Sequence, residues 1–176
     1  MSKDRHWWFI AYPDSLPNNW VDILIETCLP YYISPLHLYD LDSEGKTKKP
    51  HYHIIVSFDG PTTFKNVHEK ICKPLNATIP KPILSVKGAF DYLTHKNHPD
   101  KYPYDIEEII YLNGASIKEI NKAYLYTQLF TAIEIMIVDK NITSIRDLTF
   151  KAREKNDEDM LTCIRNNVYY WKEFMK

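Results

Sequence analysis

The fold is decided by the stretch HYHIIVSF at residues 51–58. It is rich in β-branched and aromatic residues, which is typical of a buried strand. The polar turn LDSEGKTKKP at residues 41–50 precedes it, and a second apolar run lies before that turn at residues 32–39. Two strand-like runs on either side of a polar turn predict an antiparallel hairpin.

Working outward from the hairpin, patterns typical of strands alternate with patterns typical of helices. The predicted elements are strand 6–12, helix 19–29, strand 32–39, strand 51–58, helix 63–72, strand 79–86, helix 87–96 and strand 108–112. Prolines interrupt the 79–86 run, which favours the edge of a sheet. This order predicts an α+β fold, a ferredoxin-like antiparallel sheet with helices on one face. One face of the sheet is then available for a site.

The pattern changes near residue 115, after which every segment favours helix. We therefore expect one domain over residues 1–115 and a small all-helical C-terminal domain over residues 116–176. Ser144 and Asp157 are suited to begin two of the later helices. About 60 helical residues form a marginal core. We expect them to pack on the first domain or on copies of themselves.

Composition limits the class of protein and its partners. The 176 residues are 44% hydrophobic and 26% charged, which is ordinary for a globular chain. Twenty-two Lys and Arg balance 23 Asp and Glu, so a nucleic-acid partner would require a local basic patch. The three cysteines are far apart and no apolar run is long enough to span a bilayer. These features predict a cytoplasmic protein that does not enter membranes.

The predicted hairpin carries a candidate metal site. His51 and His53 alternate along one strand, so their side chains point to the same face. His37 joins them if it lies opposite His53, whereas Asp40 is out of alternation and joins only if the strand ends, bulges or twists there. Three imidazoles and one carboxylate suit Mn²⁺, Zn²⁺ or a related ion better than Mg²⁺ or Ca²⁺. The alternative is a pair of ordinary surface histidines.

The predicted helix 87–96 carries a candidate nucleophile. Tyr92 and Lys96 lie one turn apart there, so a cation would lie beside a phenol. With such help a tyrosine can attack a phosphate. The alternative is a buried or stacking tyrosine, because the chain has 13 of them.

Lysines are concentrated around these segments. Residues 61–104 contain seven lysines against three acidic residues. The candidates for contact with a phosphate backbone are Lys46, Lys48, Lys49 and Lys87. Trp7 and Trp8 offer stacking surfaces for single-stranded bases. The alternatives are a solvated turn for the lysines and core positions for the tryptophans.

Taken in order, these segments resemble the HUH endonucleases, and among them the replication initiators of small rolling-circle plasmids. The N-terminal motif matches RHWWFIAYPDSLP at residues 5–17, and the His-hydrophobic-His motif matches PHYH at residues 50–53. The motif with the single catalytic tyrosine matches YLTHK at residues 92–96, followed by Pro99, Lys101 and Tyr104. The resemblance covers residues 5 to 113, roughly the first two thirds of the chain.

The resemblance implies a site-specific, metal-dependent nicking and joining enzyme that starts rolling-circle replication. A divalent ion, Mn²⁺ by preference with Mg²⁺ or Zn²⁺ as alternatives, would be held by His37, Asp40, His51 and His53. Tyr92 would attack the scissile phosphate of a single-stranded or hairpin origin and form a 5′-phosphotyrosine bond. Lys96 would neutralise the phosphate or stabilise the phenolate. Tyr102 and Tyr104 leave a two-tyrosine scheme open.

The resemblance also implies partners. Origin DNA, as a single-stranded or hairpin nick site with adjacent duplex, is the expected substrate, and the C-terminal helices are expected to form a homo-oligomer. The sequence has no helicase phosphate loop, which implies a separate host helicase. Three alternatives remain. One is another HUH enzyme (a relaxase or transposase), and the second is a non-catalytic ferredoxin-like module that binds single-stranded nucleic acid. The third, ranked last because no cysteine lies near the cluster, is a structural metal site in an interaction protein.

Overall fold

The computed structural model describes residues 3–176, except for the side chain of Ala123. The chain divides into two compact units, Met1–Ile120 and Asn121–Lys176. The first contains a sheet with helices and the second is helical. The expected α+β class, an antiparallel sheet followed by a helical C-terminal region, is confirmed.

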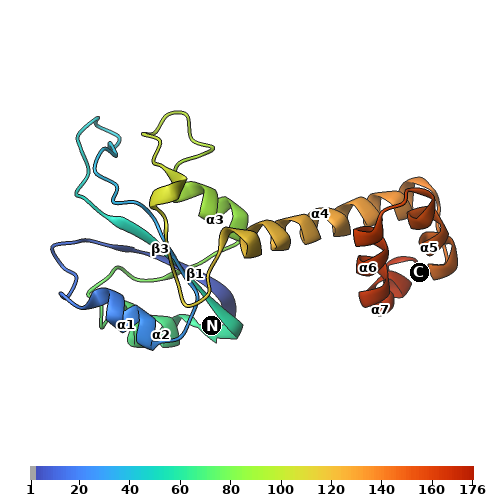
Figure 1. Cartoon of the computed structure of the whole chain (residues 1–176), viewed down its shortest axis with the longest axis horizontal. Coiled ribbons are helices and arrows are strands. Elements are labelled where there is room, and N and C mark those ends of the chain that lie inside the picture. The colour runs from blue at the N-terminus through green and yellow to red at the C-terminus, as the bar shows by residue number, and fades with distance from the viewer. Residues whose placement is uncertain (1–2) are drawn as a thin grey trace. The chain divides into compact units, whose positions relative to one another are not determined.

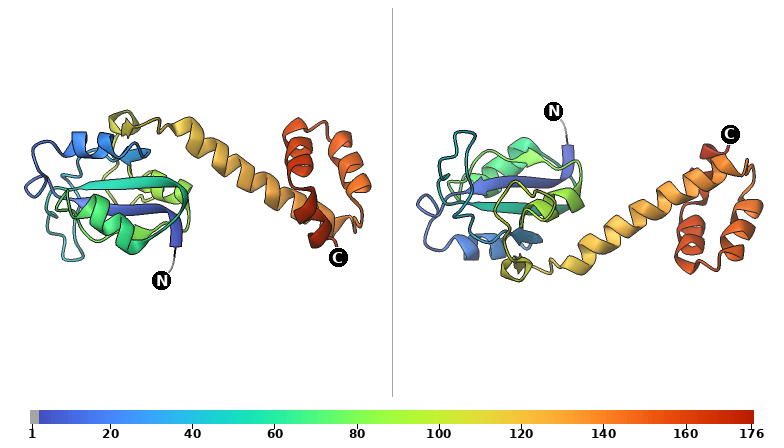
Figure 2. Two further views of the ribbon diagram at one scale, coloured as in Figure 1. Left: turned by 90° about the horizontal axis from the view of Figure 1, so that it is seen from below. Right: turned by 90° about the horizontal axis from the view of Figure 1, so that it is seen from above.

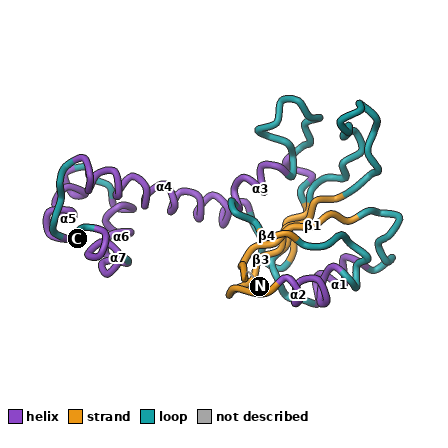
Figure 3. Tube along the Cα trace, turned by 180° about the vertical axis from the view of Figure 1, so that it is seen from behind, coloured by secondary structure: helices purple, strands orange, loops and turns teal. Residues whose placement is uncertain are grey.

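Five strands form the sheet of the first unit (Figure 3). They are β1 (Lys3–Ala11), β2 (Tyr31–Ile33), β3 (Tyr52–Thr63), β4 (Lys81–Pro82) and β5 (Ile110–Leu112). Their order is β4-β1-β3-β2-β5, and every neighbouring pair is antiparallel. The two longest strands, β1 and β3, pair at the centre, where Trp8 lies opposite Ile55.

One face of the sheet is covered by α1 (Trp20–Glu26), α2 (Phe64–Val67) and the π-helical turn His68–Cys72 (Figure 1). Alternate residues of β1, Trp7 and Phe9, are buried in this core. The remaining buried members come from the other strands and these helices: Ala11, Leu24, Tyr31, Ile33, Ile54, Val56, Val67, Ile71, Cys72 and Leu75.

The other face carries α3 (Val86–Tyr92), which lies on the side of the sheet opposite α1 and α2 (Figure 1). Phe90 and Leu93 belong to a second core with Tyr32 and Ile55. The face that the sequence left available is therefore partly covered. The part near Trp8 and His53 is hollowed instead.

Three predicted elements are shorter than expected. The strand at residues 32–39 ends at Ile33, just before Pro35, and only an isolated bridge between His37 and His51 continues the pairing. The strand at 79–86 is reduced to Lys81–Pro82, because proline cannot donate to a sheet ladder. The helix at 87–96 ends at Tyr92.

The second unit is built from α4 (Ile117–Asp139, which begins in the first unit), α5 (Ile145–Glu154), α6 (Glu158–Asn166) and α7 (Val168–Phe174) (Figure 2). The hydroxyl of Ser144 accepts a hydrogen bond from the Asp147 amide, and the Asp157 carboxylate accepts one from the Met160 amide. Both predicted N-caps are therefore formed. The core surrounds Trp171, which is fully buried. Within residues 3–176, none of the helices combines the length and apolarity that a membrane span needs.

Candidate metal and nucleic-acid site

Four predicted ligands come together at the hollowed face. His37, Asp40, His51 and His53 are all buried, and one ligand atom from each lies within 4.8 Å of those of the others. They come from two segments on either side of the polar turn. Beyond the end of β2 these segments are joined by single contacts, such as the bridge between His37 and His51, rather than by a continuous ladder, so His37 and Asp40 need not alternate strictly.

The pairing of these segments differs from the one expected. The His37 amide donates to the His51 carbonyl oxygen at 2.9 Å, so His37 lies opposite His51 rather than His53. The strand has already ended before Asp40, whose carbonyl oxygen accepts from the Lys48 amide at 2.7 Å. This ending satisfies the condition under which Asp40 can reach the same point as the histidines.

Several hydrogen bonds fix the orientation of the cluster. His37 Nδ1 lies 3.3 Å from Asp40 Oδ2, and His37 Nε2 lies 2.9 Å from the Leu93 carbonyl oxygen. His51 Nδ1 lies 2.8 Å from the Lys49 carbonyl oxygen. The second oxygen of Asp40, Oδ1, accepts a hydrogen bond from the Tyr104 hydroxyl at 3.1 Å. Such outer contacts orient ligands around a metal.

His53 shows that the cluster fits a cation. Both of its ring nitrogens are buried and neither has a hydrogen-bond partner among the described residues. Burial lowers the pKa of His53 to about 2, with smaller contributions from His37 and His51. The ring is therefore neutral and its lone pair is available. A buried imidazole without a partner is costly unless something binds it, and a divalent cation is suited to do so.

His95 is a fourth imidazole at the cluster, which the sequence analysis did not identify. Its Nε2 lies 3.7 Å from Asp40 Oδ2 and finds no hydrogen-bond partner in the part of the chain that the structure describes, while Nδ1 lies 2.9 Å from the Tyr102 carbonyl oxygen. The turn after α3 places it there, and its backbone has φ of 57°, in the left-handed region. Its position three residues after Tyr92 was the feature of the sequence that could have identified His95 as part of the site.

Asp40 is held ionised among these imidazoles. Burial opposes its ionisation, but His37, His95 and the Tyr104 hydroxyl outweigh that cost and hold the pKa of Asp40 below its usual range. Burial also lowers the pKa of His37 and of His95. The cluster thus combines one carboxylate with several imidazoles, a donor set suited to first-row divalent ions.

Tyr92 is the last residue of α3 and lies beside this cluster. Its ring centroid is 5.2 Å from that of His53. The Lys101 ammonium contacts its hydroxyl and lies 4.4 Å from the ring centroid. Lys96 is exposed in the turn that follows, because the helix has ended and the Lys96 amide bonds the Asp91 carbonyl oxygen. The lysine at the Tyr92 hydroxyl is therefore Lys101.

The four predicted DNA-contacting lysines are distributed differently. Lys48 and Lys49 line one groove together with Asp40, His51, His53 and Tyr92. Lys49 also lies 3.4 Å from Asp14 and 5.2 Å from the Tyr12 ring centroid. Lys46 pairs with Glu44 at 2.8 Å in the exposed turn, and Lys87 pairs with Asp91 on α3. The structure brings two of the four to the groove.

Residues 1–118 match the family model described as "Plasmid replication protein, origin binding domain". The chain belongs to this family. It is thus a plasmid replication initiator of the rolling-circle type, as the motif order predicted. The matched residues include the whole histidine cluster, Tyr92 and Lys101.

Curated relatives agree with this assignment. A "Replication protein" from Staphylococcus aureus is 33% identical over 179 residues, covering 99% of this chain and 89% of that protein. "Replication protein RepB" from Lactiplantibacillus plantarum is 39% identical over 116 residues, or 66% of this chain and 52% of that protein. A RepB from Streptococcus agalactiae is 32% identical over 158 residues, or 83% of this chain and 75% of that protein.

Proposed function

We propose that this initiator nicks and rejoins one DNA strand at its plasmid origin, with Tyr92 as the nucleophile. The observation that carries the proposal is the position of the Tyr92 hydroxyl. It contacts the Lys101 ammonium, and its ring packs at 5.2 Å from His53 of the buried cluster. A phenol, a cation and a set of ligands for a divalent ion therefore meet at one end of a groove.

The metal is assigned to the cluster of His37, Asp40, His51 and His53, for which Mn²⁺ is the preferred ion. When bound, it would polarise the scissile phosphate as a Lewis acid. Tyr104 and the Lys49 carbonyl oxygen keep Asp40 and His51 oriented. This assignment rests on the donor set and on the unpartnered nitrogens of His53.

Tyr92 carries the covalent step. Its oxygen bonds to phosphorus while the bond from phosphorus to the 3′-oxygen breaks, which leaves a 5′-phosphotyrosine and a free 3′-hydroxyl. The phenol proton goes to water and the leaving oxygen takes one from water. Lys101 stabilises the phenolate, and Lys48 and Lys49 bind backbone phosphates in the groove. The role of Lys96 in neutralising phosphate stays a prediction.

A covalent-adduct assay tests this proposal. The full chain is incubated with single-stranded DNA covering the origin of the plasmid that encodes it, in Mn²⁺ or in EDTA. We expect a protein–DNA adduct only in Mn²⁺, its loss in Tyr92→Phe, and its retention in Tyr102→Phe and, at saturating Mn²⁺, in Tyr104→Phe. An adduct in Tyr92→Phe would move the nucleophile to another tyrosine. DNA binding without any adduct would favour a binding module.

The proposal includes self-association through the second unit and a separate host helicase. Exposed apolar side chains in this unit support self-association: Ile135, Val138, Phe150, Tyr169 and Phe174. Sedimentation velocity of the full chain should show an oligomer that Ile135→Asp with Val138→Asp weakens. A wild-type monomer at micromolar concentration would refute this part alone.

A further inference from the structure

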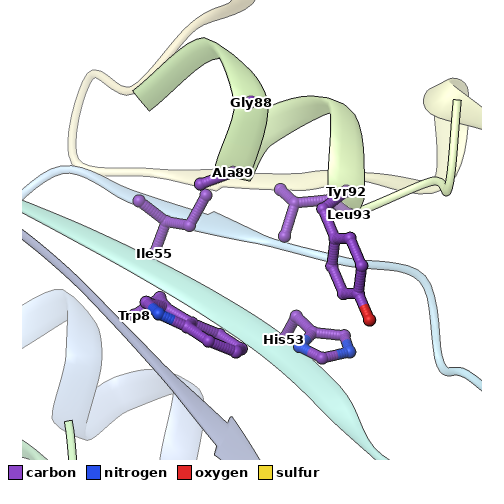
Figure 4. Close-up of a pocket in the computed structure, with 7 residues that line it drawn as sticks. All are labelled: Trp8, His53, Ile55, Gly88, Ala89, Tyr92 and Leu93. Carbon is purple, nitrogen blue, oxygen red and sulfur yellow. The ribbon is translucent and has the colours of Figure 1, made fainter. Parts of the chain in front are cut away.

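A second cavity lies on the other side of Tyr92 from Lys48 and Lys49. It has a volume of about 390 Å³ and opens between the sheet and α3 (Figure 4). Trp8, His53 and Ile55 line it from the sheet, and Gly88, Ala89 and Tyr92 line it from α3. A volume of this size is typical of sites for small ligands, about 300–1,000 Å³.

The residues of α3 explain why the space exists. Gly88 and Ala89 present almost no side chain, whereas the next residue, Phe90, is buried against the sheet. The Phe90 side chain therefore fills the space between the helix and the sheet, and the two small residues beside it leave a gap above Trp8. The indole of Trp8 is only half-buried, and Lys81 Nζ lies 5.8 Å from its ring centroid.

This cavity adjoins the groove of the metal cluster. Trp8, His53 and Tyr92 line both, so the nucleophile stands between them. On one side lie the lysines and the ligands for a cation, which suit phosphate. On the other side the lining is apolar and aromatic, which suits the planar base of the same strand.

We propose that this cavity binds the base of a nucleotide adjoining the scissile phosphate, with the base stacked on Trp8. The inference rests on the proposed function, because Tyr92 defines the position of the phosphate. The lining residues with polar side-chain atoms are His53 and Tyr92, which are engaged by the reaction itself, and Trp8, whose indole N–H lies in the plane of the ring and points away from a base stacked on its face. The base is therefore held by stacking and shape rather than by hydrogen bonds to its edges. Loss of the base should cost more than its replacement by another base.

The test is a scan of abasic sites along a labelled single-stranded origin oligonucleotide, with binding to the full chain measured by fluorescence anisotropy in EDTA. One abasic position should weaken binding by about tenfold or more. Ala89→Leu, which fills the cavity, should weaken binding of the intact strand to a similar extent. In Ala89→Leu, the same abasic site should lower the affinity for DNA hardly at all, because the cavity is already filled. Ala132→Leu, the same substitution at an exposed position of α4, is the matched control.

Two results of the binding assay would overturn the inference. One is that no single abasic position stands out. The other is that the effects of the abasic site and of Ala89→Leu multiply, which would place the sensitive base elsewhere. A measurement on the wild-type chain guards against misfolding of the variant: 5-iodouracil at the sensitive position should photo-crosslink to Trp8. Crosslinks confined to other residues would also refute the proposal. Because binding is measured without metal, a missing adduct in Mn²⁺ would refute nicking alone.

Discussion

Lys96 and Lys101 lie five positions apart in the turn after α3, and they differ in their contacts with Tyr92. Lys101 contacts the Tyr92 hydroxyl, whereas Lys96 is exposed in the turn after α3. A hydrogen bond from a charged donor is stronger than a neutral one, and the proposed reaction requires such a donor where the Tyr92 oxygen gains negative charge. The two lysines therefore give a matched comparison at the scale of one residue.

We predict that Lys101→Met slows formation of the Tyr92 adduct by about ten- to a hundredfold, since a charge-assisted hydrogen bond contributes about 1.5–3 kcal/mol. Lys96→Met should slow it less. Single-turnover rates at saturating DNA and Mn²⁺ would measure both. A larger effect of Lys96→Met would show that Lys96, the lysine of the family motif, stabilises the phenolate.

Tyr104 acts on the cluster through Asp40. Its hydroxyl donates to Asp40 Oδ1, its oxygen accepts from the Tyr39 amide, and its ring stacks on His37 with centroids 4.1 Å apart. Tyr102, two residues away, is exposed and contacts Tyr104 only through its ring. Tyr104 is thus a positioning residue for Asp40, whereas Tyr102 is a surface residue.

We predict that Tyr104→Phe weakens Mn²⁺ binding by about tenfold, because outer hydrogen bonds to metal ligands typically contribute this much. Tyr102→Phe should leave the affinity unchanged. Isothermal titration calorimetry with Mn²⁺ gives both values. Equal affinities in the two variants would show that the Tyr104 hydrogen bond does not orient Asp40 for the ion.

The sequence identified the four cluster residues because pairs of histidines and a nearby carboxylate stand out as types. It could not identify His95 or the contact of Lys101, which depend on the turn after Tyr92. His95 has φ of 57°, a left-handed conformation that the pattern of side chains does not predict. The pairing of His37 with His51 was equally hidden, because the early end of β2 sets it.

At the scale of elements, α3 is short and its start is fixed by one side chain. The Ser85 hydroxyl accepts from the Gly88 amide at 3.1 Å, and the helix ends at Tyr92 two turns later. Ser144 caps α5 in the same way, at 3.1 Å from the Asp147 amide. The two caps share their chemistry, but only the first holds an element of the site.

We predict that Ser85→Ala and Ser144→Ala each lower the free energy of unfolding of their own unit by about 1 kcal/mol. Only Ser85→Ala should also slow adduct formation, since fraying of α3 displaces Tyr92. Urea unfolding and adduct kinetics on the same preparations compare the two effects. Equal slowing by Ser144→Ala would contradict a specific role for the α3 cap.

The order of elements was predictable because turn residues and apolar periodicity mark where helices and strands begin and end. The lengths of the elements were harder to predict, since they depend on tertiary pairing. Residues 79–86 favour a strand by composition, yet Pro80 and Pro82 remove ladder donors and leave two residues paired with β1. The coverage of the second face by α3 follows from long-range packing of Phe90 and Leu93, which local pattern does not encode.

For the whole molecule, each unit carries its own reporter of unfolding. Cys72 is buried in the core of the first unit and Cys163 in that of the second. Burial raises the pKa of Cys72 to about 12 and also raises that of Cys163. Neither thiol is therefore reactive until its unit opens, whereas Cys28 is exposed.

We predict that pulse labelling with a thiol reagent along a urea series modifies Cys163 at lower urea than Cys72. The reason is size, because the second unit spans only residues 121–176 and a small core gives marginal stability. Mass spectrometry of the labelled peptides gives the two midpoints. A single shared midpoint would mean that the units unfold as one.

A bound metal ion should increase the difference between the urea midpoints of Cys72 and Cys163 labelling. The cluster draws its ligands from segments around residues 37–40 and 51–53, which meet only in the folded first unit. An ion that binds only the native state at a hundred times its dissociation constant adds about 2.7 kcal/mol of stability. Mn²⁺ should thus raise the midpoint of Cys72 labelling and leave that of Cys163 in place. Equal shifts would contradict binding at this cluster.

The early end of β2 has a consequence for how long the protein survives. The segment that holds His37 and Asp40 is tied to β3 by one bridge rather than a ladder. Outside the cluster it is held by a few single hydrogen bonds, among them those from the Tyr39 amide to Tyr104 and from the Lys48 amide to the Asp40 carbonyl oxygen. Proteases attack such segments when they open. A cation bound at the proposed site would join this segment to β3 and should therefore slow proteolysis of the first unit, so a host starved of that metal would lose its initiator sooner.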